Sequence, residues 1–413
     1  MAGSGAGVVP VLVLRAGVVF DGEVRRSGAD VLVEAGRVVA VEDSAPPPSD
    51  AELVDLGAGV TLLPGLVDAH QHLVMNASLD VVDFLVQASD DELAAQGRLA
   101  AATALAAGVT TVRDLGDRGY VTLALRDELA ADPAAGPRLL VSGPPLTTVG
   151  GHCWFLGGEV DGVEQMRASV AERADRGVDV VKVFATGGNL TPGSDPGAAQ
   201  FAPGELSALV AEVHRHGLPV AVHAHGRDGI AAALEAGADT IEHFSFMTAD
   251  SVVGDDALVD AVAAAGMRVV LTPGSVPGQS PPLGNIRAQL PLILALQRSL
   301  IGAGVWVALG SDGGVAPNKP HDVMPYAVAM TTWTGRSPTD ALTAATARAG
   351  EAVGLGGEVG VLRPGAAADV LAVNGDPTVD VDALVDVVAV YRAGQRVAGA
   401  LRRPPAVRPP NLP

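Results

Sequence analysis

Residues 61–72 read Thr-Leu-Leu-Pro-Gly-Leu-Val-Asp-Ala-His-Gln-His, an apolar run that ends in two histidines one residue apart. If this run is a strand, its side chains alternate between two faces, so His70 and His72 point to the same side. Two neutral imidazoles on one face form half of a transition-metal site. The pair alone is a weak signal, because such spacing also arises by coincidence. Further ligands elsewhere in the chain are needed to complete a site.

Length, charge and cysteine content limit the classes of protein. The chain has 413 residues, enough for a barrel of about 250 residues and an accessory domain. Its formal net charge of −20 disfavours binding to nucleic acid or to an anionic membrane. The single cysteine, Cys153, excludes an intrachain disulfide and fits a reducing compartment. Because we find neither a secretory leader nor an apolar stretch of about 18 residues, the sequence predicts a cytoplasmic protein.

The middle of the chain alternates between short apolar runs and Ala-rich stretches with helical spacing. The expected strands are 61–70, 109–114, 138–142, 178–184, 219–223, 240–244, 268–272 and 305–311. The expected helices include 92–107, 204–216, 227–236, 286–303 and 338–353. This repeat is typical of a (β/α)8 barrel of the TIM type. Several loops that follow strands are long and rich in Gly and Pro, so we expect the active site on their side of the barrel.

Strand-like sequence at both ends of the chain predicts a second, smaller unit. Neither end is long enough to bury a core alone, so we expect the two to build one composite β-sandwich. The predicted fold class is therefore α/β, a (β/α)8 barrel with a small sandwich from both termini. We divide the chain into 1–60 and 358–403 for the two parts of the sandwich, 61–357 for the barrel, and 404–413 for a Pro-rich tail.

More candidate ligands stand at or just after the ends of predicted strands, namely Lys182, His223, His225, His243 and Asp312. Lys182 is one of two lysines, against 25 arginines, and it lies inside an apolar strand. A buried lysine easily loses its proton, and a neutral amine can react with carbon dioxide to give a carbamate that bridges two metals. The alternative is a lysine that snorkels from the strand end. Taken together, these side chains suit two divalent metals that hold a hydroxide between them. Asp312 could accept the proton of that hydroxide.

These residues lie in a series of motifs along the chain. In order, the motifs are PGLVDAHQH (64–72), VVKVFATGG (180–188), VAVHAHG (220–226), IEHFSF (241–246), LGSDGG (309–314) and VLRPGAAADVLAV (361–373). With them the chain resembles the metal-dependent amidohydrolase superfamily, in particular its binuclear, prolidase-like branch of Xaa-Pro dipeptidases and ochratoxinase-related enzymes. The resemblance implies the metal ligands His70, His72, Lys182 as a carbamate, His223, His243 and Asp312.

The resemblance also implies the cofactor and the catalytic groups. Two divalent metal ions are expected, with zinc as the default and Mn, Co or Fe as alternatives, since all suit nitrogen and carboxylate ligands. His152 and His225 are expected to face the substrate and to act in catalysis with Asp312. Some hydrolases of this branch polarise the carbonyl with a tyrosine, but none of the three tyrosines falls in the expected loops. In this chain the metal, together with His152 or His225, would then polarise the carbonyl.

Other side chains are candidates for contacts with the substrate. Trp154 lies in a loop without charged residues other than histidine, which predicts a neutral, hydrophobic substrate group next to the scissile bond. Arg113 is either a substrate contact or one half of an ion pair with Asp114. A substrate carboxylate could bind to one of a few groups, which are His225, Arg118, Arg287 and Lys319. Cys153 is expected to be structural, because no base is assigned to it.

The sequence therefore predicts a prolidase- or carboxypeptidase-like amidohydrolase. A metal-bridged hydroxide would cleave the amide C–N bond of a dipeptide or N-acyl amino acid. Hydrolysis of a lactone, carbamate or cyclic amide at the same centre is the alternative. A deaminase is disfavoured, because no Glu follows His223 before Glu235, and a non-catalytic scaffold is expected to lack ligands that this chain retains. The expected partner is a small-molecule substrate, without nucleic acid or membrane, and a homo-oligomer is left open.

Overall fold

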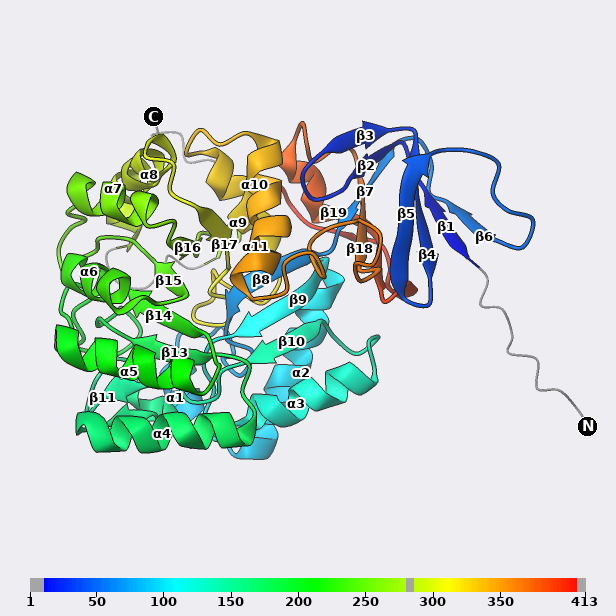
Figure 1. Ribbon diagram of the computed structural model, residues 1–413. Helices are drawn as coiled ribbons and strands as arrows, with labels where there is room; N and C mark the ends of the chain where they lie inside the picture. The colour runs from blue at the N-terminus through cyan, green and yellow to red at the C-terminus, as the bar shows by residue number, and fades with distance from the viewer. Residues whose placement is uncertain (1–10, 280–285, 407–413) are drawn as a thin grey trace, which may run out of the picture.

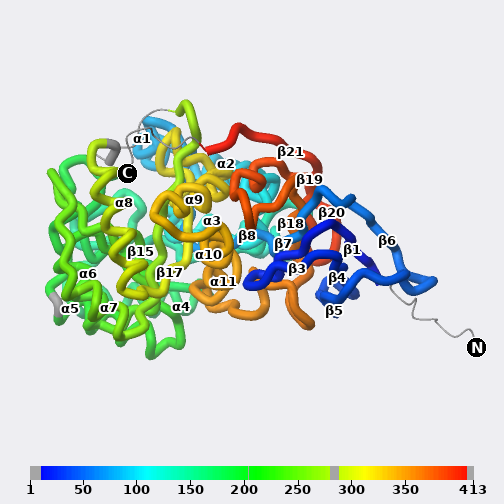
Figure 2. Tube along the Cα trace, turned by 90° about the horizontal axis from the view of Figure 1, so that it is seen from above, coloured from blue at the N-terminus to red at the C-terminus, as the bar shows by residue number. Residues whose placement is uncertain are grey.

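The computed structural model describes residues 11–279 and 286–406. Residues 1–10 of the predicted N-terminal segment, 280–285 of a predicted loop and 407–413 of the predicted tail lie outside the described residues. The fold is mixed α/β and has two parts. One part contains parallel strands and most of the helices, and the other contains strands from both ends of the chain, which lie side by side in both views (Figures 1 and 2).

Parallel strands form the centre of the larger part, in two sheets of order β10-β9-β8 and β13-β14-β15-β16-β17. Their bounds are Leu66–Gln71 (β8), Val109–Asp114 (β9), Arg138–Val141 (β10), Val181–Phe184 (β13), Val220–Ala224 (β14), Thr240–His243 (β15), Arg268–Leu271 (β16) and Val307–Leu309 (β17). Hydrogen bonds also link the two sheets. Leu146 N donates to Lys182 O at 2.8 Å on one side, and Ser311 N donates to His70 O at 3.1 Å on the other. The strands are buried almost throughout, as parallel strands covered on both faces are.

Helices follow most of the parallel strands and pack on their outer side (Figure 1). Their bounds are Val81–Gln87 (α1), Asp90–Ala106 (α2), Val121–Ala131 (α3), Gly162–Arg176 (α4), Pro203–Arg215 (α5), Arg227–Ala236 (α6), Asp256–Ala264 (α7), Ile286–Gly302 (α8), Met324–Thr332 (α9), Pro338–Ala344 (α10) and Ala347–Ala352 (α11). Local sequence sets their ends. Ser89 and Glu92 form a capping box at the start of α2, and Gly177 ends α4 in the left-handed conformation. None of the helices in the described ranges is long and apolar enough to cross a membrane.

The smaller part consists of two sheets that share a core. A sheet of order β5-β4-β1-β6 faces a sheet that contains β20, β19, β18, β7, β2 and β3, with β21 paired to β19. The bounds are Leu12–Arg15 (β1), Val18–Phe20 (β2), Arg25–Ser27 (β3), Ala29–Glu34 (β4), Arg37–Asp43 (β5), Glu52–Asp55 (β6), Val60–Pro64 (β7), Val370–Asn374 (β18), Asp386–Arg392 (β19), Gln395–Ala398 (β20) and Leu401–Arg402 (β21). Leu14, Val31, Leu62 and Val370 are among the residues of this core, so both ends of the chain contribute to it.

The expected strand 61–70 is two strands in the structure. β7 pairs with β18 in the smaller part, and β8 pairs with β9 in the larger part. The chain passes between the sheets at Gly65, where a Cβ atom would stand 2.1 Å from the Thr110 side chain. Glycine is therefore required at this crossing, and Pro64 before it has no N–H to continue the ladder. The His-x-His pair still ends a buried parallel strand, as expected.

The expected helix 338–353 is likewise interrupted, and forms α10 and α11. The carbonyl of Ala345, at the break, accepts a hydrogen bond from Val67 N of β8 at 2.9 Å. A continuous helix would use that carbonyl internally, so contact with the sheet competes with the helical pattern. Short segments complete the chain, namely β11 (Thr147–Thr148), β12 (Glu159–Val160), η1 (Trp154–Leu156) and η2 (Val381–Val385).

Candidate metal centre

Two groups of possible metal ligands meet at the carboxyl ends of the parallel strands. His70, His72 and Asp312 form one group, and His223, His225 and His243 form the other. Within each group, one ligand atom from every residue lies within 4.8 Å of the others. The groups are adjacent, because the rings of His70 and His243 have centroids 4.7 Å apart. Five of the six predicted ligands are thus gathered at one place, and His225, predicted as a substrate contact, lies among them.

Each histidine of the two groups has one ring nitrogen beside a protein partner. The partners are Glu242 Oε2 for His70 Nδ1 (2.8 Å), Gly116 O for His72 Nδ1 (3.5 Å), Gly187 O for His223 Nε2 (2.9 Å), Ser245 Oγ for His225 Nδ1 (2.7 Å) and Thr272 Oγ1 for His243 Nδ1 (2.8 Å). We assign the proton of His70 to Nδ1, because Glu242 Oε2 is nearer to that nitrogen (2.8 Å) than Asp312 Oδ1 is to Nε2 (3.6 Å). The proton of His223 is assigned to Nε2, which faces a carbonyl, and the other nitrogen of each of these two rings keeps its lone pair. Metal-binding histidines in proteins are held in this way.

Burial favours the neutral form of four of these imidazoles. It lowers the pKa of His70 to about 3 and that of His225 to about 4. Burial, with the neighbouring histidines and Lys182, also holds the pKa values of His223 and His243 well below 6.5. A neutral imidazole is the form that coordinates a metal, so these four histidines are in the required state at neutral pH.

Asp312 is placed opposite the His-x-His pair. Its Oδ1 lies 3.6 Å from His70 Nε2 and 3.5 Å from His72 Nε2. Burial alone would raise the pKa of Asp312, but the hydrogen bond with His72 and the charge of Lys319 hold it well below its ordinary range. The carboxylate is therefore ionised and available to a cation.

Two of the candidate ligands have left-handed backbone conformations. The φ angles of His243 and Asp312 are +70° and +58°. Non-glycine residues in this region cost about 1–3 kcal/mol each, and such strain is concentrated at functional sites. The surrounding structure therefore forces these two strand ends into the positions that bring the ligands together.

Lys182 is the sixth predicted ligand, in the middle of β13. Its side chain is fully buried, and its Nζ has no hydrogen-bond partner among the described residues. Burial lowers the pKa of this amine to about 8, although the Glu242 and Asp312 charges act in the opposite direction. A buried amine without a partner is costly. The lack of a partner fits an amine that is converted to a carbamate, because carbamate oxygens could bind cations.

Lys319, the other lysine, is bound quite differently. Its Nζ donates to Thr272 O at 2.9 Å and to Ser311 O at 2.7 Å, which links the loops that follow β16 and β17. It therefore lies next to Asp312 as a cation with two backbone partners. Of the other predicted carboxylate-binding groups, Arg118 donates to carbonyls at the end of α1, and the Arg287 side chain lies outside the described part of the structure.

The other predicted substrate contacts occupy different environments. His152 is buried with its ring 5.1 Å from that of His223, and its Nδ1 has no partner in the described ranges. Trp154 is 46% exposed on η1. Arg113 does not pair with Asp114, because consecutive strand residues point to opposite faces. It is buried and its Nη2 bonds Glu242 Oε1 at 2.9 Å, so its known contacts are with protein groups.

Comparison with known proteins identifies the family. The profile of the amidohydrolase family matches residues 61–397. The chain belongs to the amidohydrolase family. It is 29% identical to ochratoxinase of Aspergillus niger over 380 residues, which cover 84% of this chain and 77% of the relative. It is 30% identical to imidazolonepropionase of Salinispora arenicola over 380 residues, with 84% and 86% covered. A solved Xaa-Pro dipeptidase with methionine in its active site has a TM-score of 0.80 and 26% identity, with 94% of this chain and 99% of that chain covered.

Sequence reasoning missed one group that supports the centre of this amidohydrolase. Glu242 is fully buried between His70 and Arg113. Burial opposes its ionisation, but the Arg113 charge and the His70 hydrogen bond lower its pKa to about 2. Its position, an acidic residue inside an apolar strand and directly before a candidate ligand, is the signal that could have identified it.

Asp68, which the alternation places on the side of the two histidines, supports the backbone instead of a ligand ring. Its carboxylate accepts hydrogen bonds from Ser311 N at 2.8 Å, His70 N at 3.2 Å and Gln71 Nε2 at 2.8 Å. It thereby fixes the end of β8 against the residue before Asp312. Cys153 is buried next to His152, and burial raises the pKa of its thiol to about 12, which disfavours a nucleophilic thiolate.

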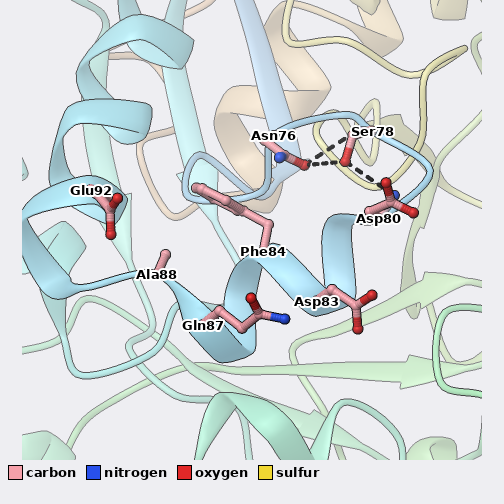
Figure 3. A pocket seen from close by; sticks show the side chains of 8 residues that line it. All are labelled: Asn76, Ser78, Asp80, Asp83, Phe84, Gln87, Ala88 and Glu92. Atoms are coloured by element: carbon pink, nitrogen blue, oxygen red, sulfur yellow. Dashed lines mark hydrogen bonds between the residues drawn. The ribbon is translucent and has the colours of Figure 1, made fainter.

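A hollow of about 440 Å³ lies beside α1 and the loop that precedes it (Figure 3). Its lining residues are Asn76, Ser78, Asp80, Asp83, Phe84, Gln87, Ala88 and Glu92. Hydrogen bonds from Ser78 to Asn76 and from Asp80 N to Ser78 shape this loop, as the dashed lines show. The hollow contains none of the candidate ligands, so it is separate from the two histidine groups.

Proposed function

We propose that this amidohydrolase is a metal-dependent enzyme that cleaves an amide C–N bond in a dipeptide or N-acyl amino acid with a hydrophobic side chain. The observation that carries this proposal is the buried amine of Lys182, which has no hydrogen-bond partner among the described residues, beside two groups of histidines and one ionised carboxylate. Two of the relatives support it by name, since one is an ochratoxinase and the other a Xaa-Pro dipeptidase.

We propose that the eight parallel strands form a closed (β/α)8 barrel around this centre. The hydrogen bonds of Leu146 with Lys182 and of Ser311 with His70 support closure. Leu146 follows β10 and Ser311 follows β17, so each bond joins the segment after an edge strand of one sheet to an edge strand of the other sheet. In such barrels the active site lies at the carboxyl ends of the strands, which is where the candidate ligands meet. The smaller part would then be the composite β-sandwich.

The residues fit two divalent cations. We propose that His70, His72, His223, His243 and Asp312 would hold them, together with a carbamate on Lys182, and that zinc is the default metal. When bound, such ions supply a hydroxide at neutral pH and polarise the scissile carbonyl. His225 lies in one of the two groups with its Nδ1 at Ser245 Oγ, and we propose that its Nε2 faces the substrate.

The chain's own groups would move the proton and hold the substrate. Asp312 is ionised and held at the mouth of the site, so it can accept a proton and pass it to the leaving nitrogen. His152 and His225 would donate to the carbonyl oxygen as negative charge develops on it. For His225 the Ser245 hydroxyl would donate to Nδ1, so that Nε2 carries the proton. Burial lowers the pKa of His152 to about 3, so it would donate as a neutral imidazole.

The walls near the centre favour an apolar substrate group. One apolar cluster beside the site contains Phe184, Phe155, Leu156 and Leu190. The ring centroids of Phe184 and His152 are 5.0 Å apart. A charged side chain would enter such surroundings unpaired, at a cost of several kcal/mol. We also propose that the partner is a small molecule alone and that the protein acts in the cytoplasm, which fits the single cysteine.

Hydrolysis of a cyclic amide is the second candidate. The identity of 30% with an imidazolonepropionase favours it, because that relative covers most of this chain. The same centre could also hydrolyse a lactone or carbamate, since these reactions share attack on a carbonyl carbon. The candidates differ in the group that follows the carbonyl, and substrate tests separate them.

The test is a hydrolysis assay with metal-loaded protein and matched substrates. N-acetyl-Phe, a Leu-containing and an Arg-containing dipeptide, an imidazolone and a lactone are compared by kcat/KM, with Asp312→Asn as the control for contaminating hydrolase. We expect the N-acyl and dipeptide substrates with hydrophobic side chains to be preferred. Preference for the imidazolone would favour the second candidate, and activity that survives in the control variant would refute this centre as the site of hydrolysis.

A further inference from the structure

Glu242 uses its two carboxylate oxygens for different partners. Oε2 lies 2.8 Å from His70 Nδ1. Oε1 accepts from Arg113 Nη2 at 2.9 Å and from Thr240 Oγ1 at 2.5 Å. All three side chains around the carboxylate are buried, so water does not compete for these contacts. The arrangement gives each oxygen a fixed role.

Arg113 also contacts the backbone beside His70. Its Nε donates to Ala69 O at 2.7 Å, in addition to its bond with Glu242. The guanidinium is rigid and planar, so these two contacts hold the carboxylate and the β8 backbone in one fixed relation. His70 is thereby oriented through its ring and through its preceding peptide.

We propose that Arg113 and Glu242 form a positioning pair that sets the tautomer of His70. With two donors on Oε1, the carboxylate presents Oε2 to His70 as an acceptor, which places the ring proton on Nδ1. The lone pair of Nε2 then faces Asp312, whose Oδ1 is 3.6 Å away. This proposal rests on the proposed metal centre, because Nε2 is the atom that would bind a cation. In this proposal both residues act through His70.

If the pair sets the tautomer, Glu242→Gln should move the ring proton of His70. Arg113 and Thr240 both point donors at the position of Oε1, so the amide oxygen must occupy it. The amide NH₂ group then faces His70 Nδ1, which must become the acceptor, and the ring proton moves to Nε2. A protonated Nε2 cannot bind a metal. Removal of Arg113 as well frees the amide to turn, because the Thr240 hydroxyl can accept as well as donate.

The experiment compares wild type, Glu242→Gln and the double variant Arg113→Met/Glu242→Gln. Zinc affinity is measured by competition with a chromogenic chelator, and the His70 tautomer is read from ¹⁵N NMR of metal-free protein, with His70→Gln to assign its signals. We expect Glu242→Gln to bind zinc about 10–100-fold more weakly and to carry the proton on Nε2. The double variant is expected to recover affinity to within a few-fold and to return the proton to Nδ1.

Arg173→Met is the matched control, because Arg173 is also buried but donates to Pro144 O and Ser169 O, away from the candidate ligands. Urea denaturation of every variant separates loss of folding from loss of zinc. The proposal is overturned if Glu242→Gln keeps the wild-type tautomer and affinity, or if the double variant fails to recover. A wild-type protein that binds no zinc would contradict the proposed function, while the NMR comparison would still decide the role of the pair.

Discussion

Replacement of Lys182 by methionine should stabilise the metal-free protein. The amine is fully buried and has no hydrogen-bond partner in the described part of the chain. Burial, the largest cause, lowers its pKa from the ordinary value of 10.5 to about 8. Because each pKa unit corresponds to about 1.4 kcal/mol, the charged amine destabilises the folded state by about 3 kcal/mol. Methionine has a similar length and no charge, so it removes this penalty.

The effect depends on pH with a defined sign. The unfolded chain keeps the Lys182 proton up to pH 10.5, whereas the folded protein releases it near pH 8. Between these values the unfolded state binds more protons, so the stability of wild type rises with pH. The advantage of Lys182→Met is therefore full below about pH 8 and disappears as the pH approaches 10.5.

The assay is urea denaturation of chelator-treated protein in buffer free of carbon dioxide, at pH 7 and pH 9.5. The difference between variant and wild type cancels the other titrating groups. Lys319→Met is the matched control. It removes a lysine whose Nζ donates to Thr272 O and Ser311 O, so it should destabilise the protein by about 2 kcal/mol. If Lys182→Met is no more stable than wild type at pH 7, the amine has a partner and the reasoning for its modification is wrong.

Three further outcomes are expected. Asp312→Asn should keep zinc but lose about 10²–10⁴-fold in kcat, because an amide cannot accept the proton, and a loss of only a few-fold would show that Asp312 is structural. Cys153→Ala should keep kcat/KM within a few-fold, since burial raises the pKa of the thiol to about 12, and complete inactivation would show that the thiol takes part. Zinc titration in carbon dioxide-free buffer should give one ion per chain, and two after bicarbonate is added, if Lys182 must first be carbamylated.

The sequence predicts the elements of the larger part well where a pattern is local. Buried runs that end in polar residues give the parallel strands, and their ends give the positions of His70, His223, His243 and Asp312. Neither interruption is visible in periodicity. The break at Gly65 depends on the close approach of Thr110, and the break between α10 and α11 depends on a hydrogen bond from Val67. Both are tertiary effects that overrule a continuous local pattern.

The contacts that support the candidate ligands are harder to predict from the sequence than the candidate ligands themselves. Alternation separates Arg113 from Asp114, but it does not show that Arg113 reaches Glu242 across the sheets. Likewise, nothing in the local sequence of Lys319 shows that it bonds the ends of two loops. Arg113 and Glu242 are 129 positions apart, and Lys319 and Thr272 are 47 positions apart, so both contacts depend on the order of strands around the sheet.

The charges around the centre give an independent reason for a modified lysine. Glu242 is balanced by Arg113, so Asp312 is the one carboxylate among the proposed ligands, and the charge of Lys319 acts on it. A single divalent cation can be held by such a set, but a second one would bring two more buried positive charges beside the first, with an amine in place of an anion. In the proposed centre, carbamylation of Lys182 would replace that amine with a negative group. Binding of a second ion would therefore depend on the chemistry of this one side chain.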